Sequence, residues 1–199
     1  MTPFAVLLSG RGTNMEALAA NILTGKLDGR IVLVASDNPE AEGLAKAASL
    51  GLPTKCYPYG KVGRQVFEEK ISGDITEAGA EWVVLAGFMR ILSPAFVSRF
   101  WGKIVNIHPS LLPSFPGTDA IAKAWRYGVR VTGVTVHLVD EEVDHGMILA
   151  QEPVRVEAGE SIASLECRIH EVEHDLYWRT LKELFKKNET WTFERRTAP

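Results

Sequence analysis

The chain has 199 residues, of which 46% are hydrophobic and 24% charged, and its formal net charge at pH 7 is -3. The length suits one domain with a sizeable core, and the composition excludes collagen-like, coiled-coil and disulfide-rich classes. The charge gives no general attraction to nucleic acid or acidic membranes, and no apolar run is long enough to span a bilayer. Because the two cysteines, Cys56 and Cys167, form no metal-binding pattern and we recognise no export signal, we expect reduced thiols in the cytoplasm.

Strand-like and helix-like segments alternate along the first half of the chain. Short runs of β-branched and apolar residues, such as 4–8 and 82–86, predict strands that are buried on both faces of a parallel sheet. The segments between such runs carry apolar residues at helical spacing, which predicts right-handed βαβ units. In chain order, the pattern predicts strands over 4–8, 31–35, 54–57, 82–86 and 104–107, and helices over 14–23, 40–50, 64–78 and from Ser93-Pro94 onward.

The pattern changes after residue 110. A proline-rich loop over Leu112–Gly117 is followed by a predicted short helix over Asp119–Tyr127. Val131–Leu138 alternates apolar and polar residues, and Met147–Val156 does so less regularly, so both are predicted to be antiparallel or edge strands. A long amphipathic helix is predicted over Ser161–Lys186.

The predicted fold class is α/β, a single Rossmann-like domain over residues 1–199. Its sheet is expected to be open and mostly parallel, with helices on both faces and an antiparallel edge in the C-terminal half. In such sheets ligands bind beyond the carboxyl ends of the strands, near the point where the strand order reverses. The loops that follow the strands are therefore the candidate sites.

The loop Ser9–Asn14 lies between the first predicted strand and the first predicted helix. Its glycines let backbone N–H groups approach an anion, and the helix N-terminus adds a favourable dipole. It is not a dinucleotide fingerprint, because Met15 stands where the third glycine belongs, and it lacks the Lys-Ser/Thr of a P-loop. The loop predicts a site for a single phosphate or carboxylate, with a plain strand-to-helix turn as the alternative.

Two later loops carry further candidates. Gly87–Pro94 could offer its backbone to a planar heterocycle while its apolar side chains pack on the faces, although its composition alone favours a plain connection. Asn106 and His108, two apart on an apolar strand, point to the same face. Asn can donate to a developing oxyanion and His can exchange protons near neutral pH, whereas a lone His at a strand end is more often structural.

The segment His137–Gly146 is an acidic turn. Such a run is usually a solvated loop, and it fails as an EF-hand because His145 and Gln151 stand where Gly and Glu are needed. A carboxylate folded back onto His108 would hold the ring and favour its imidazolium form. The turn contains four carboxylates, those of Asp140, Glu141, Glu142 and Asp144.

The run His170-Glu171-Val172-Glu173-His174 satisfies the H-E-x-x-H pattern of zinc peptidases. Two histidines four residues apart on one helical face can bind Zn²⁺. However, few residues follow the motif, and only Glu183, Glu189 and Glu194 are later ligand candidates. A zinc peptidase is therefore a remote alternative.

Five motifs together carry a resemblance to a known family. They are SGRGTN at 9–14, LAGFMRILSP at 85–94, NIHPSLLPSFPG at 106–117, GVTVHLVDEEVDHG at 133–146 and EVEHDLY at 171–177. In order and spacing, over nearly the whole chain, they resemble the folate-dependent formyltransferase family and, within it, the phosphoribosylglycinamide formyltransferases. The stretch NIHPSLLP alone would indicate only the wider group of formyltransferases and hydrolases.

The resemblance implies transfer of a formyl group from the co-substrate 10-formyltetrahydrofolate to the amino group of glycinamide ribonucleotide, in purine biosynthesis and without a metal. It implies a phosphate-binding half over about 1–105 and a catalytic, folate-binding half over about 106–199. The implied catalytic residues are Asn106, His108 and Asp144. The implied ribonucleotide contacts are Gly12, Thr13, Asn14 and Glu173. The implied formyl-folate contacts are Arg64, Met89, Arg90, Ile91, Leu92, Asn106, Asp140, Glu141 and Asp144.

With Glu173 as a substrate ligand, the zinc-like motif becomes a coincidence. The partners implied are small molecules rather than nucleic acid or membrane, and the chain is expected to be a monomer or a homodimer. Two departures concern the rim of the site: residues 118–121 replace a segment in which relatives often carry His, and Trp178 stands where Pro is common. The roles of His137 and His145 stay open.

Three alternatives share parts of this pattern. A formyltetrahydrofolate hydrolase would use the same three residues with water as the acceptor, and such enzymes usually carry an additional regulatory domain. A methionyl-tRNA formyltransferase would need a further RNA-binding domain and a basic surface. A ligand-binding module of this fold would leave Asn106, His108 and Asp144 idle.

Overall fold

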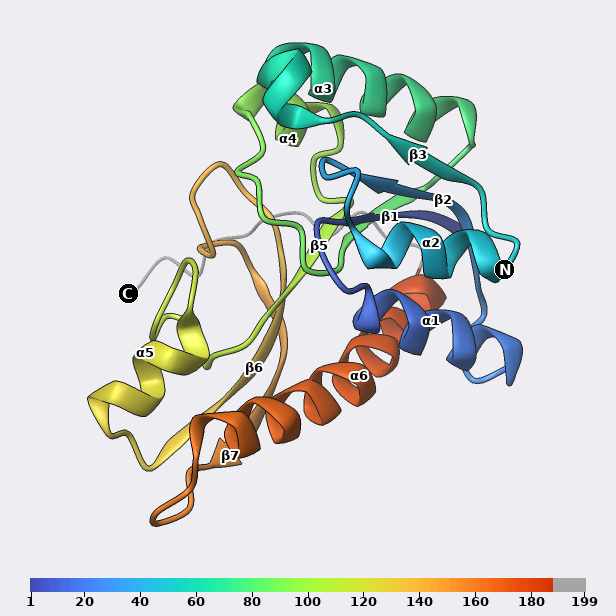
Figure 1. Ribbon diagram of the computed structural model, residues 1–199. Helices are drawn as coiled ribbons and strands as arrows, with labels where there is room; N and C mark the ends of the chain where they lie inside the picture. The colour runs from blue at the N-terminus through green and yellow to red at the C-terminus, as the bar shows by residue number, and fades with distance from the viewer. Residues whose placement is uncertain (188–199) are drawn as a thin grey trace, which may run out of the picture.

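A seven-stranded sheet forms the centre of the computed structural model, which describes residues 1–187 (Figure 1). The strand order is β3-β2-β1-β4-β5-β6-β7; the first five strands are parallel, and β6 and β7 each run antiparallel to the strand before. This topology confirms the predicted class. The strands are β1 (Thr2–Leu8), β2 (Gly29–Ser36), β3 (Thr54–Cys56), β4 (Trp82–Leu85), β5 (Ile104–His108), β6 (Val131–Leu138) and β7 (Ile148–Arg155).

Helices cover both faces of the sheet, because successive residues of each central strand point to opposite sides. In β1, Phe4 and Val6 belong to the core under α1, α2 and α6, whereas Ala5 and Leu7 belong to the core under α3 and α4 (Figure 1). All four are fully buried, which explains the unbroken apolar run of this strand. The helices are α1 (Thr13–Leu23), α2 (Glu42–Ser49), α3 (Tyr59–Glu77), α4 (Pro94–Arg99), α5 (Ala120–Tyr127) and α6 (Ile162–Lys187).

The long helix α6 is anchored to the sheet by Tyr177, which is 1% exposed. Its hydroxyl lies 2.8 Å from the carbonyl oxygen of Leu85, the last residue of β4, and 3.1 Å from that of Val105 within β5. Burial raises the pKa of Tyr177 well above its ordinary value, so the hydroxyl keeps its proton and stays a donor. The anchor fixes α6 relative to the strand ends, where the candidate loops lie.

The strands β6 and β7 confirm the predicted antiparallel pair in the C-terminal half. β6 is buried over residues 132–138 and pairs with β5 and β7 on either side, so β7 is the edge strand in this half of the sheet. One element differs from the sequence prediction. The helix α3 begins at Tyr59 rather than at Arg64 and is kinked at Gly63, whose φ of 76° glycine adopts without strain. Among residues 1–187, no helix combines the length and the hydropathy that a membrane span requires.

The strand order reverses between β1 and β4, because the chain first builds β2 and β3 on one side and then returns to place β4 on the other. The loops that follow β1 and β4 are consequently neighbours, and the amide of Ser9 donates to the carbonyl oxygen of Gly87 at 3.0 Å. Ligands of open α/β sheets bind at this kind of reversal. The fold therefore directs attention to the loops at this edge.

Candidate active site

Asn106 and His108 project from the end of β5, and His137 lies opposite Asn106 on the antiparallel strand β6. Asp144 comes from the turn after β6 and has a φ of 53°, in the left-handed region that Asp and Asn tolerate better than most residues. The end of β6 pairs with the start of β5, Leu138 with Val105, and the turn after β6 then folds back along β5, which brings Asp144 to Asn106 and His108. His108 and Asp144, 36 positions apart in the chain, thus lie side by side.

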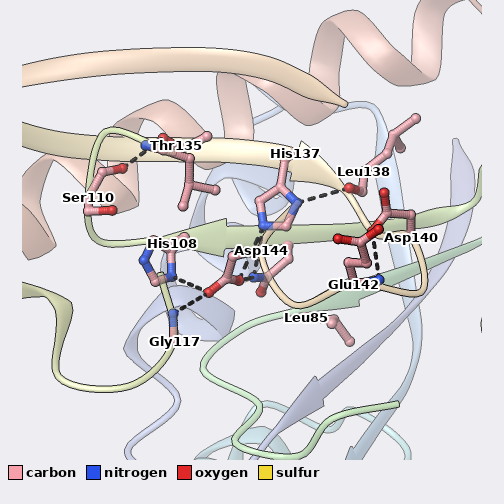
Figure 2. A network of polar contacts seen from close by, with 12 residues as sticks. Leu85, His108, Ser110, Gly117, Thr135, His137, Leu138, Asp140, Glu142 and Asp144 are labelled. Carbon is pink, nitrogen blue, oxygen red and sulfur yellow. Dashed lines mark hydrogen bonds and ion pairs between the residues drawn. The ribbon is translucent and has the colours of Figure 1, made fainter. Parts of the chain in front are cut away.

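Asp144 is the centre of the resulting polar cluster (Figure 2). Its Oδ2 lies 3.4 Å from Nδ1 of His108, and its Oδ1 lies 3.5 Å from Nδ2 of Asn106 and 3.7 Å from Nε2 of His137. The amide of Gly117 also donates to Oδ2, at 2.7 Å. The carboxylate is 11% exposed, so its negative charge acts on these neighbours through little water.

The hydrogen-bond partners define the form of each imidazole. Nδ1 of His137 donates to the carbonyl oxygen of Leu138 at 2.9 Å, so Nε2 can accept from Nδ2 of Asn106, 3.1 Å away. Burial lowers the pKa of His137, which keeps this ring neutral near pH 7. Nε2 of His108 donates to the carbonyl oxygen of Phe115 at 2.9 Å, while its Nδ1 faces Asp144. Both nitrogens of His108 thus face oxygen atoms, an arrangement that suits a ring able to carry positive charge.

The loop that contains Phe115 and Gly117 is held over His108 by a buried hydroxyl. Thr135 Oγ1 donates to the carbonyl oxygen of Ser110 at 2.7 Å and accepts from the amide of Leu112 at 3.0 Å. Gln151 Nε2 donates to the carbonyl oxygen of Leu112 at 2.9 Å. The structure therefore anchors the start of this loop to β6 and β7, beside the polar cluster.

The turn that carries Asp144 is stabilised by Asp140. Oδ1 of Asp140 accepts from the amide of Glu142 at 3.0 Å, and Oδ2 lies 2.8 Å from Nδ1 of His145. A Cβ placed at Gly146 would lie 1.8 Å from the carbonyl oxygen of Leu138, so only glycine lets the chain return so closely to β6. Glu141 is exposed on the same turn.

The predicted anion loop has the geometry of an anion site. The first hydrogen bond of α1 joins the amide of Glu16 to the carbonyl oxygen of Gly12, so the preceding amides, those of Thr13 and Asn14 among them, point out of the helix end. Gly12 has a φ of 73°, and a Cβ there would lie 2.5 Å from Cα of Gly43 in α2. Glycine is required at this position for both reasons.

Glu173 of α6 meets this loop. Its Oε2 lies 3.5 Å from Nδ2 of Asn14 and 2.8 Å from Nδ1 of His170, whose Nε2 is 3.4 Å from Arg11. The hydrogen bond from His170 to Glu173 raises the pKa of His170. Asn14 is 8% exposed and its Oδ1 has no hydrogen-bond partner, so the loop holds an unused polar atom beside a buried carboxylate. The implied ribonucleotide residues are thus together at one end of α1.

The implied formyl-folate residues are distributed over two elements and two loops. Met89 and Ile91 are each 64% exposed, whereas the side chain of Leu92 is 7% exposed and packs in the core, which leaves its main chain as the part a ligand can contact. Arg90 Nε donates to Asp37 at 2.6 Å. Arg64 Nε lies 3.3 Å from Glu68 on α3, and Glu68 in turn accepts from the amide and the hydroxyl of Ser93.

The zinc-like motif does not assemble a metal centre in the part of the chain that the structure describes. No group of three His, Cys, Asp or Glu side chains in residues 1–187 has a metal-binding arrangement. His170 is instead bonded to Glu173 and lies next to the Arg11 guanidinium. Two of the three later ligand candidates, Glu189 and Glu194, lie outside the described residues.

Sequence reasoning did not identify every residue of the cluster. The alternation of β6 marks His137 as a polar residue of a strand, but its place opposite Asn106 comes from the pairing of β5 with β6. Gly117 and Phe115 contribute main-chain atoms, for which side-chain identity carries little signal. Outside this cluster, Asp37 directly follows the apolar run of β2 as a charged residue, which is a signal for the carboxyl end of a buried strand.

The fold and the cluster correspond to a known class of protein. The family model described as Formyl transferase matches residues 2–181, and the chain belongs to this family. This confirms the resemblance that the five motifs indicated.

Individual relatives indicate a narrower group within this family. The phosphoribosylglycinamide formyltransferase of Bacillus subtilis (strain 168) is 37% identical over 189 residues, which are 94% of this chain and 97% of that protein. The trifunctional purine biosynthetic protein adenosine-3 of Gallus gallus is 47% identical over 171 residues, or 85% of this chain, although these cover only 17% of that protein. The crystal structure of phosphoribosylglycinamide formyltransferase from Bacillus halodurans is similar with a TM-score of 0.91 at 38% identity, covering 97% of this chain and 100% of that one. These relatives favour a formyl-transferring enzyme over a peptidase.

Proposed function

We propose that this chain transfers the formyl group of 10-formyltetrahydrofolate to the amino group of N1-(5-phosphoribosyl)glycinamide, a step of purine biosynthesis. The observation that carries the proposal is the position of the Asp144 carboxylate, 3.4 Å from His108 and 3.5 Å from Asn106. An amide donor, an imidazole and a carboxylate around one point are the groups that acyl transfer requires. The names of the relatives support the same reaction.

The neutral amine of the ribonucleotide attacks the formyl carbon, forming a C–N bond and a tetrahedral intermediate whose oxygen is negative. Asn106 Nδ2 and the imidazolium of His108 stabilise this oxygen. In the structure, Nε2 of His108 donates to the Phe115 carbonyl oxygen, so the formyl oxygen replaces that carbonyl when the substrates bind. Asp144 stabilises the positive charge on His108 from the other side of the ring.

The intermediate collapses when the bond between the formyl carbon and the folate nitrogen breaks. The attacking amine must lose one proton and the departing nitrogen must gain one, so no net proton is released. Asp144 and His108 are adjacent and can move this proton, with ordered water completing the path. The products are the N-formyl ribonucleotide and tetrahydrofolate.

Each substrate has its own group of residues. The phosphate of the ribonucleotide binds at Gly12, Thr13 and Asn14, where outward-pointing amides and the dipole of α1 favour an anion. Another part of this substrate is assigned to Glu173, whose buried carboxylate lies beside Asn14 at the same loop. Formyl-folate binds between the loop after β4 and the turn after β6, with residues that include Arg64, Met89, Arg90, Ile91, Leu92, Asp140 and Glu141.

The reaction uses formyl-folate as a co-substrate and needs no resident metal. We place it in the cytoplasm, in a chain that acts as a monomer or a homodimer. One domain carries both substrate sites, with the phosphate-binding part before about residue 105 and the catalytic part after it.

A release assay tests the proposal. Purified protein is mixed with 10-formyltetrahydrofolate, with and without the ribonucleotide, and the appearance of tetrahydrofolate is followed. Release that depends strictly on the ribonucleotide supports the transferase. Equal release without it would instead support a formyltetrahydrofolate hydrolase, and no release under either condition would support a binding module.

A further inference from the structure

Asp37 follows β2 directly and places a carboxylate between the loop after β1 and the loop after β4. Its side chain is 1% exposed. The two loops are the proposed ribonucleotide loop (residues 9–14) and the proposed formyl-folate loop (residues 87–93). A buried carboxylate is costly unless it is paired and hydrogen-bonded, so its partners indicate what it holds in place.

Asp37 has one partner on each loop. Its Oδ1 accepts from the hydroxyl of Ser9 at 2.6 Å, and its Oδ2 accepts from Nε of Arg90 at 2.6 Å. A third hydrogen bond connects the two loops directly: the amide of Met89 donates to Oγ of Ser9 at 2.8 Å. These three short hydrogen bonds form the Ser9–Asp37–Arg90 network, which links the loops through one buried charge.

The network also fixes the orientation of Arg90. The guanidinium lies over the ring of Tyr59, 4.5 Å from its centroid, and the amide of Tyr59 donates to the carbonyl oxygen of Asp37 at 3.0 Å. Arg90 is therefore held by charge on one side and by an aromatic face on another. Since only Nε is used by Asp37, the two terminal nitrogens of Arg90 are presented in a defined direction.

We propose that Asp37 is a positioning residue that sets the loops for both substrates, and that it acts through Ser9 and Arg90 without touching either substrate. The inference rests on the proposed function, because that function assigns the two loops to the ribonucleotide and to formyl-folate. Removing the charge of Asp37 leaves Arg90 without its ion-pair partner and loosens the proposed formyl-folate loop most. The ribonucleotide loop is affected less, because Nδ2 of Asn38 also donates to the carbonyl oxygen of Ser9 at 3.1 Å and the amide of Gly43 donates to that of Gly10 at 3.0 Å.

The test is Asp37→Asn, with Asp74→Asn as the matched control. Asp74 of α3 accepts from the hydroxyl of Tyr57 at 2.7 Å and lies 3.8 Å from Nζ of Lys55 in β3, so it also joins two segments, but it contacts neither loop. In Asp37→Asn we expect the KM for formyl-folate to rise about tenfold, the KM for the ribonucleotide about threefold, and kcat to change less than twofold. In Asp74→Asn we expect Tm to fall while both KM values stay unchanged.

A second readout requires no substrate. In the unmodified protein, hydrogen exchange measured by NMR should be slow at Nε–H of Arg90 and at the amide of Met89, and Asp37→Asn should accelerate both while Asp74→Asn accelerates neither. Unchanged exchange, or unchanged KM values in Asp37→Asn, would overturn the inference. If the unmodified protein shows no ribonucleotide-dependent release, the proposed function fails, and the exchange measurement still decides whether Asp37 joins the two loops.

Discussion

Asn106 and His137 are register partners across β5 and β6, and Nδ2 of Asn106 lies 3.1 Å from Nε2 of His137. Because Nδ1 of His137 is committed to the carbonyl oxygen of Leu138, the ring presents an acceptor to Asn106. The amide of Asn106 is thereby turned so that its nitrogen, rather than its oxygen, faces the cluster. Its second hydrogen points toward Asp144 at 3.5 Å, a long bond that a formyl oxygen can replace.

His137→Ala should lower kcat about fivefold while the KM for the ribonucleotide changes less than twofold. The variant removes one hydrogen bond that orients Asn106, worth roughly 1 kcal/mol, and since about 1.4 kcal/mol corresponds to a tenfold change in rate, this loss corresponds to about fivefold. Steady-state kinetics with both substrates varied provide the measurement. His137→Gln, whose side-chain oxygen can accept from Asn106, should recover part of the rate. An unchanged kcat in a folded Ala variant would remove His137 from the site.

His108→Ala and Asp144→Asn should each lower kcat by about 10²–10⁴, the usual contribution of a general acid–base group. Ribonucleotide binding, measured by calorimetry, should persist because neither residue contacts the phosphate loop. Asparagine is the right replacement at position 144, because the φ of 53° would strain most other residues. Asp175→Asn, on the exposed side of α6, is the matched control. Near-normal turnover of both site variants would show that the catalytic assignment is wrong.

Glu173→Gln should raise the KM for the ribonucleotide about tenfold and change kcat little. Glu173 is 5% exposed and pairs with His170 beside Asn14, so its charge orients the polar groups around the proposed phosphate loop. A hydrogen bond to a charged group is worth roughly 1.5–3 kcal/mol. Glu171 lies two residues before Glu173 in α6 and is exposed, so Glu171→Gln should leave the KM for the ribonucleotide unchanged. Equal KM values in the two variants would move the ribonucleotide site elsewhere.

His170 should contribute a pH-dependent stability. Its hydrogen bond to Glu173 raises its pKa in the folded protein above the ordinary 6.5, so folding favours the protonated ring. The stabilisation is fully present below about pH 6.5 and is lost as pH rises through the raised pKa. The Tm difference between the natural chain and His170→Ala should therefore be largest near pH 6 and shrink toward pH 8.

The comparison with His170→Ala is needed because two other histidines change the stability with pH in the opposite direction. Burial lowers the pKa values of His137 and His174, so both rings stay neutral in the folded protein while the unfolded chain takes up protons. They reduce stability as pH falls below about 6.5. The effect of His137 is common to both proteins and cancels in the Tm difference, whereas that of His174 changes slightly, because the charge of His170 is one of the causes that lower the pKa of His174. A difference that is constant with pH would show that the pKa of His170 is not raised.

Treatment with EDTA should leave the formyl-transfer activity unchanged, and added Zn²⁺ should not raise it. His170 Nδ1 is already bonded to Glu173, and a metal ion at Nε2 would lie next to the positively charged Arg11, 3.4 Å from that nitrogen. Activity after extensive dialysis against the chelator, compared with the untreated enzyme, measures this. Inhibition that Zn²⁺ reverses would revive the peptidase alternative.

Local chemistry determined much of what could be predicted. The apolar runs of β1, β2 and β4 are buried on both faces, and such runs are visible without any knowledge of neighbours. Gly12 and the start of α1 were recognisable because a tight turn before a helix has a local signature. The pairing of Asn106 with His108 on one face of β5 follows from the two-residue period of a strand.

The tertiary structure alone decided which distant groups meet. The turn after β6 contains four carboxylates, and the sequence does not show which of them reaches His108. The outcome depends on the antiparallel pairing of β6 with β5 and on the backbone conformation of the turn, and hydrophobic periodicity encodes neither. The same holds for Asp37, which acquires its partners only because β1 and β4 are neighbours in the sheet. Strands and turns are set by interactions between nearby residues, whereas the cluster at Asp144 results from packing between segments that are far apart in the chain.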